Sequence, residues 1–121
     1  MRKTFRLVSV VISTLALFGA VSVATVTAGD DSAIKEGKKI ALDRKKGNCL
    51  ACHMIIGEEQ PGNIGPPLIA MQARFPDKDV LKAQISDPRI KNPNSSMPPF
   101  GAHGILSADE LDKITEYIHS L

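Results

Sequence analysis

The sequence predicts a small all-α domain. Residues 31–47 and 107–121 each place apolar side chains at the three- and four-residue spacing of an amphipathic helix. There is no convincing pair of alternating strand segments and no internal repeat. Large aromatic side chains are scarce, with no Trp, one Tyr and four Phe in 121 residues. Because a domain of this size has little interior of its own, we expect a bound group to complete its core.

Residues 1–28 are predicted to be a signal peptide, and residues 29–121 the folded domain. A basic start precedes an apolar run over residues 7–26, and Ala28 ends a small-residue cleavage pattern. An uncleaved membrane anchor is the alternative, because the run approaches the ~20 residues of a spanning helix. Cleavage reduces the 15 Lys/Arg by three to 12, against 13 Asp/Glu, so the domain has a net charge of −1. The basic footprint of a nucleic-acid-binding protein is therefore missing, and we expect a periplasmic domain, free of the membrane after cleavage.

The first helix is expected at the start of the folded domain. Asp31 or Ser32 can cap it, and Gly47 stands at its expected end. Its apolar stripe consists of Ile34, Gly37, Ile40 and Ala41. A glycine inside a helix costs ~1 kcal/mol relative to alanine, so we expect Gly37 to have a packing role.

Both cysteines of the chain lie in one short segment. Cys49, Cys52 and His53 have the spacing C-x-x-C-H, which is the attachment site of a c-type haem. Two thiols at this spacing can reach the two vinyl groups on one edge of a porphyrin and form thioethers. The next side chain, His53, is then held under the iron as its proximal ligand. The sequence therefore predicts one covalently bound haem c.

Three other kinds of site could contain these cysteines. A thioredoxin-type dithiol calls for a βαβ setting, which the sequence lacks. A zinc site needs four ligands, and the two cysteines with His53, His103 and His119 have no recognisable zinc-site spacing. A structural disulfide leaves His53 unexplained. Haem attachment accounts for all three residues of the motif.

The loop over residues 61–68 is rich in Pro and Gly and follows the haem motif. Its prolines leave carbonyl groups without a helical partner. The Pro66 carbonyl is a candidate acceptor for the Nδ1–H of His53, a support that is usual for metal-bound histidine. An ordinary turn explains the composition equally well. Leu68, Met71 and Phe75 then form a short apolar segment, in which we expect Met71 to be buried.

Two further helices are expected in the second half of the chain. One begins after Pro76 and stops at Asp87, before Pro88. Its apolar residues are Val80, Leu81 and Ile85. In the other helix, Ser107 and Glu110 form a capping box. Its apolar face consists of Leu111, Ile114, Ile118 and Leu121, and its Tyr117 is expected to lie on the backbone that Gly37 leaves open.

The iron of an electron carrier needs a sixth ligand, because an open position invites O₂ chemistry. Met97 lies 44 residues after His53 in a loop of Asn, Ser, Pro and Gly, and the two prolines that follow restrict its backbone. His103, in the same loop, is the competing candidate. Filling a gap in the core is the ordinary role of a methionine. We prefer Met97, because Met54 adjoins the proximal ligand, Met71 is expected in the core and His119 on the surface.

Basic residues cluster just before the haem motif. They are Lys35, Lys38, Lys39, Arg44, Lys45 and Lys46. A docking face for an acidic redox partner and a solvated helix face are both compatible with this cluster.

These motifs together resemble the class I c-type cytochromes over residues 29–121. More narrowly, the segments GNCLACH, PGNIGPPL, ARFPD and NPNSSMPPFG, with a closing IL-x-x-x-E-L helix, are similar to SoxX. SoxX is the mono-haem subunit of the SoxAX cytochrome in periplasmic thiosulfate oxidation. The ordered set of five segments is more specific than C-x-x-C-H, which many families share.

The resemblance implies a low-spin haem c with His53 and Met97 as iron ligands, and Pro66 as the partner of His53. It also implies a SoxA-like cytochrome subunit that carries the catalytic haem of an L-cysteine S-thiosulfotransferase. There, thiosulfate is coupled oxidatively to the cysteine of the SoxYZ carrier. The chain itself has no catalytic residue in this interpretation; it accepts electrons from SoxA and passes them to a small cytochrome c.

Two other haem functions remain open at this point. One is a free soluble cytochrome c that serves a terminal oxidase. The other is a gas-binding haem protein with an open sixth position.

Overall fold

The computed structural model describes residues 28–121. Its helices are α1 (Ala28–Leu42), η1 (Cys49–Ala51), α2 (Met71–Arg74), α3 (Lys78–Ser86), η2 (Pro88–Ile90) and α4 (Ala108–His119). Within this range the β-type pairing is a single parallel bridge between Ile55 and Leu68, so the all-α prediction is confirmed. The predicted signal peptide lies outside the described residues except for Ala28, the first residue of α1. No helix of the described range is long and apolar enough to cross a membrane.

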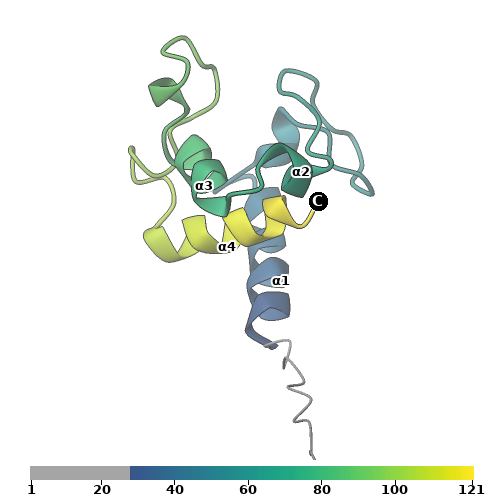
Figure 1. Ribbon diagram of the computed structural model, residues 1–121. Helices are drawn as coiled ribbons and strands as arrows, with labels where there is room; N and C mark the ends of the chain where they lie inside the picture. The colour runs from purple at the N-terminus through teal and green to yellow at the C-terminus, as the bar shows by residue number, and fades with distance from the viewer. Residues whose placement is uncertain (1–27) are drawn as a thin grey trace, which may run out of the picture.

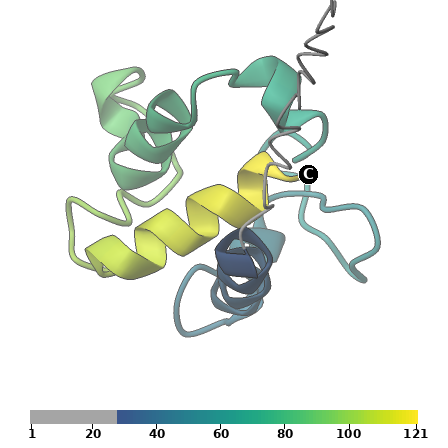
Figure 2. The same cartoon turned by 60° about the horizontal axis from the view of Figure 1, so that its bottom comes forward.

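Helices α1 and α4 cross, and this contact is the most extensive between helices of the described range (Figures 1 and 2). Figure 2 views α1 nearly end-on, with α4 passing across it. At the crossing, a Cβ atom on Gly37 would lie 1.9 Å from the Lys113 carbonyl oxygen and 2.9 Å from the Tyr117 Cβ. Only glycine allows the two backbones to approach this closely. The predicted packing of Tyr117 at Gly37 is confirmed.

The capping box of α4 is present as predicted. The Glu110 backbone N–H donates to the Ser107 hydroxyl at 3.2 Å, and the Ser107 N–H donates to the Glu110 carboxylate at 3.0 Å. Leu111, Ile114 and Ile118 are buried in the core. The helix ends at His119, so the predicted helix is two residues too long, but Leu121 packs against the core as its place on the predicted apolar face required. Leu121 is half-buried, and its carbonyl accepts the Met71 N–H at 2.8 Å.

Both predicted ends of the first helix are wrong. Asp31 and Ser32 are not caps, because α1 begins at Ala28 and includes both. A carboxylate in the first turn is favourable with the helix dipole, so Asp31 is compatible with this position. The helix ends at Leu42, five residues before Gly47. Asp43 stops it: its carbonyl accepts the N–H groups of two following residues at 3.0 Å, and its carboxylate accepts a third at 2.8 Å.

Helix α3 begins and ends where the sequence predicted. The Asp77 carboxylate caps it by accepting the Asp79 N–H at 2.9 Å, and the helix stops before Pro88. Leu81 and Ile85 are buried. Val80 is 40% exposed, so its place in the predicted apolar stripe is wrong. A step of one residue turns a helix by about 100°, which carries Val80 away from the core side that Leu81 faces.

Candidate haem site

A cavity of about 790 Å³ lies between two long connecting segments. The segment before α2 and the segment between α3 and α4 lie on opposite sides of the molecule, and both contribute to its lining (Figure 1). Its apolar lining includes Leu68, Met71, Phe75, Leu81, Ile85, Phe100, Leu106, Ile114 and Ile118. Cavities of about 300–1,000 Å³ with such linings are typical ligand sites. The cavity agrees with the expectation that a bound group completes the core.

The C-x-x-C-H segment forms a helical turn on one wall of the cavity. Helix η1 begins at Cys49, whose carbonyl accepts the N–H groups of Cys52 at 3.2 Å and His53 at 2.9 Å. A helical turn places residues three and four apart on one side, and all three side chains line the cavity. Both thiols are free and half-buried. The wall therefore presents two thiols and one imidazole to the same space.

The environment of Cys49 differs from that of a redox-active thiol. Burial raises the pKa of the Cys49 thiol to about 11. Dithiol oxidoreductases instead need a cysteine whose pKa is lowered, so that a thiolate forms at neutral pH. The dithiol interpretation is therefore disfavoured.

His53 is held by the loop over residues 61–68. Its Nδ1 lies 2.7 Å from the Pro66 carbonyl oxygen, the contact that the sequence suggested. Because a carbonyl only accepts, Nδ1 carries the proton, and Nε2 keeps a lone pair for a metal. Gly65 lies against the ring: a Cβ atom there would lie 2.4 Å from Cε1 and 2.6 Å from Nδ1. Sequence reasoning did not assign this contact to Gly65, although a glycine directly before the expected acceptor Pro66 was a usable signal.

Met97 lies on the opposite segment and also lines the cavity. It is half-buried and packs against the hydrophobic core. Side chains organise the turns before it: the Asn94 N–H donates to the Asn92 side chain at 3.1 Å, and the Met97 N–H donates to the Ser95 hydroxyl at 3.2 Å. The turn-forming residues of this loop thus place Met97 in the lining of the cavity.

The other candidate sixth ligands occupy different places. His103 is exposed and outside the cavity lining, and its Nε2 lies 3.1 Å from an Arg89 guanidinium nitrogen. Met54 is 41% exposed and also outside the lining. Met71 is buried as expected and lines the cavity, with its sulfur 3.3 Å from Arg74 Nη1. His119, expected on the surface, is half-buried, with Nε2 3.1 Å from the Phe75 carbonyl oxygen.

Comparison with known proteins identifies the domain. Residues 32–118 match the family described as cytochrome C oxidase, cbb3-type, subunit III. The chain belongs to this family of cytochrome c domains. An uncharacterized lipoprotein of Aquifex aeolicus (strain VF5) is 38% identical to the chain over 78 residues. The aligned region is 62% of this chain and 37% of that relative, so the chain spans well under two thirds of the relative's length.

The cytochrome c domain binds haem c covalently, and the residues present fit this group. Cys49 and Cys52 are in place for the two thioethers, and His53 follows them with Nδ1 already engaged. The cavity beside them is large and mostly apolar. The chain is therefore an electron-transfer haem protein, as the sequence predicted.

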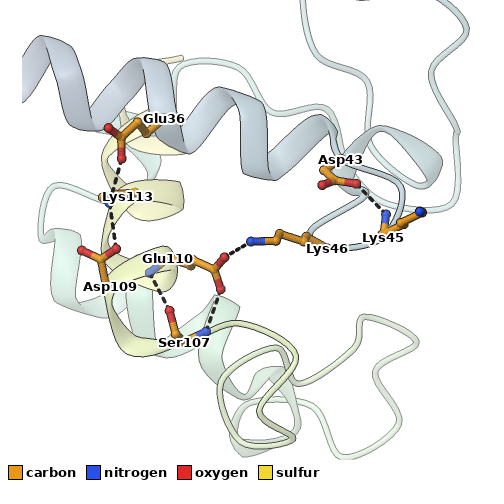
Figure 3. A network of polar contacts seen from close by, with 8 residues as sticks. All are labelled: Glu36, Asp43, Lys45, Lys46, Ser107, Asp109, Glu110 and Lys113. Carbon is orange, nitrogen blue, oxygen red and sulfur yellow. Dashed lines mark hydrogen bonds and ion pairs between the residues drawn. The ribbon is translucent and has the colours of Figure 1, made fainter.

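The charged residues that line the cavity of the cytochrome domain are all basic. They are Arg44, Lys45, Lys46 and Arg74, and within the described residues no carboxylate joins them in the lining. Lys46 forms an ion pair with Glu110 of α4, whereas the Lys45 side chain points away from this network (Figure 3). Arg74 Nη1 donates to the Pro67 carbonyl at 2.7 Å, a contact that sequence reasoning missed. The charged side chains of the lining are therefore all cationic, and one of the four, Lys46, is paired with a carboxylate.

Proposed function

We propose that His53 and Met97 are the two axial ligands of the haem iron and that the cytochrome is a one-electron relay. The observation that carries the proposal is that His53 and Met97, from opposite connecting segments, line the same cavity, while His103 lies outside it. Bound haem c supplies a one-electron iron couple. Pro66 holds the proton of His53 on Nδ1 and so directs Nε2 to the metal. A thioether from Met97 closes the sixth position and favours the reduced state.

Replacing Met97 tests this ligand assignment. In the holoprotein, Met97→Ala should abolish the methionine–iron charge-transfer band, lower the reduction potential and allow CO to bind the reduced form. Met54→Ala is the matched control, because Met54 is 41% exposed and lies outside the cavity lining. If Met97→Ala keeps the band and His103→Ala loses it, the assignment is wrong.

We further propose that the chain is the SoxX-like subunit of a periplasmic thiosulfate-oxidising complex. The ordered set of five sequence segments supports this, and so does the pairing of a thioether with His53 in one cavity. In this role a SoxA-like cytochrome subunit, acting on thiosulfate and the SoxYZ carrier, delivers electrons to the chain, which passes them to a small cytochrome c. The Aquifex relative is a lipoprotein, which supports an exported location for this chain.

A free electron carrier for a terminal oxidase is the second candidate. The family description favours it, because it names a subunit of a cytochrome oxidase. Purification of the tagged full chain from its native cells separates the two. Recovery with a larger haem subunit that oxidises thiosulfate supports the SoxX-like role. Recovery as a monomer that reduces an oxidase supports the second candidate.

A further inference from the structure

The loop over residues 88–100, here called the Met97 loop, is closed at its neck by backbone hydrogen bonds. The Ser86 carbonyl, at the end of α3, accepts the N–H groups of both Gly101 and Ala102 at 3.1 Å. A Cβ atom on Gly101 would lie 2.3 Å from the Ser86 hydroxyl oxygen and 3.1 Å from the Ser86 Cβ, so the two residues are in close contact. The two ends of the loop therefore meet at Ser86.

A second link joins the same two ends through side chains. Arg89 Nε and Nη2 donate to the two carboxylate oxygens of Asp87, each at 2.8 Å. Its third nitrogen, Nη1, lies 3.1 Å from His103 Nε2. A guanidinium group only donates, so His103 accepts this hydrogen bond with an unprotonated Nε2. Arg89 thus connects the residue that precedes the loop to a residue just beyond its end.

Few side chains in the middle of the loop are buried, although Lys91 Nζ lies 5.7 Å from the centroid of the Phe75 ring and Met97 packs against the core. Ile90 is 79% exposed, and residues 91–94 are also exposed. The buried residues of the loop are Pro88, Pro99 and Phe100, which lie at its two ends. A segment with few buried contacts opens readily unless its ends are held. The position of Met97 is therefore sensitive to the geometry of the neck.

We propose that Arg89 is a positioning residue for Met97, and that Asp87, Arg89 and His103 form a clasp that keeps the Met97 loop closed over the cavity. This inference rests on the proposed role of Met97 as an iron ligand. It also assigns a structural role to His103, the residue that the sequence offered as a competing ligand. The planar guanidinium is essential to the clasp, because it engages Asp87 with two donors while a third faces His103.

The test compares holoprotein variants by two independent measurements. Arg89→Ala should accelerate amide hydrogen exchange at Gly101 and Ala102 by a few-fold and let a fraction of the reduced protein bind CO. Arg89→Lys keeps the charge but loses the bidentate geometry, so it should behave like Arg89→Ala. The control is Lys82→Ala, which removes an equally exposed cation from its ion pair with Asp112 on the α3–α4 side.

The outcomes separate this inference from the ligand assignment. If Met97→Ala opens the iron to CO while Arg89→Ala matches Lys82→Ala in exchange and CO binding, the clasp is refuted and the ligand assignment stands. If Met97→Ala leaves the iron closed, the ligand assignment fails and the clasp is refuted as a device for positioning Met97. His103→Gln, which keeps a neutral acceptor, should retain slow exchange, and His103→Ala should not; equal exchange in both variants contradicts the role of His103.

Discussion

The contact of Gly65 with the His53 ring leads to a prediction that can be worked through quantitatively. In Gly65→Ala, the new Cβ would lie 2.4 Å from Cε1 and 2.6 Å from Nδ1 of His53. The new methyl group would collide with the His53 ring, and this ring cannot rotate aside without breaking its hydrogen bond to the Pro66 carbonyl. Gly65 does not have a positive φ, so its backbone conformation is one that alanine also adopts.

Two opposing terms set the size of the effect. Overpacking in a tight site costs about 1–3 kcal/mol, and the lost hydrogen bond adds about 1 kcal/mol. Against these, alanine restricts the unfolded chain and stabilises the protein by about 0.4–1 kcal/mol. The contacts are far shorter than van der Waals separation, so the steric term dominates. We expect a net destabilisation of about 1–3 kcal/mol and a weaker His53 ligand.

Urea unfolding of the holoprotein measures the free energy, and redox titration measures the effect on the iron. Gly57→Ala is the control on the same connecting segment: its φ is +86°, but a Cβ there meets nothing within 4 Å. It should lose stability through backbone strain alone and keep the wild-type reduction potential. If Gly65→Ala is as stable as wild type and has the same potential, the inferred contact between Gly65 and His53 does not hold the ligand.

Two further predictions concern charge. Hydrogen bonds hold the pKa of Glu110 below its ordinary value of 4.5, the largest effect coming from Lys46 and the next from Ser107 (Figure 3). A carboxyl group whose pKa is lower in the folded than in the unfolded protein stabilises the fold when the pH is above the unfolded pKa. This stabilisation is lost as the pH falls through the folded pKa. Glu110→Gln, which keeps a capping side chain, should therefore lower the melting temperature at pH 7. Its difference from wild type should shrink as the pH falls below 4.5 and through the lowered pKa of the folded protein; a difference independent of pH would contradict this. Two basic residues of the cavity lining, Arg44 and Lys45, should speed encounter with an acidic redox partner. Reversing both charges should slow bimolecular electron transfer at low salt and have little effect on its rate at high salt. Reversing the charge of Lys82, as the control, should have little effect at either salt concentration. Equal slowing at all salt concentrations would exclude an electrostatic docking role.

Features set by neighbouring residues were readable from the sequence. The C-x-x-C-H turn, the Ser107–Glu110 capping box and the stop of α3 before Pro88 all depend on residues within about four positions of one another. Gly37 was also readable, because a glycine inside a strong helix pattern needs a packing partner, and Tyr117 was the large ring available on the last helix. The errors occurred at both ends of α1, at the end of α4 and at Val80. At the helix ends, several neighbouring residues can start or stop a helix, and the local pattern does not choose among them. At Val80, the direction of the core decides which apolar residue is buried.

The sequence by itself determined the chemistry of this protein: two thiols and an imidazole at the spacing that attaches haem c, on a helical domain with too few aromatic residues to fill its own core. The tertiary structure decided which candidate lines the cavity. Met97 and His103 are six residues apart in one polar loop, and local patterns cannot separate them. Met97 lines the cavity, whereas His103 lies outside the lining, beside Arg89. The Ser86 carbonyl accepts the N–H groups of Gly101 and Ala102 and so joins the two ends of the loop that carries Met97. Both contacts join residues at least 14 positions apart, so they exist only once the chain has folded.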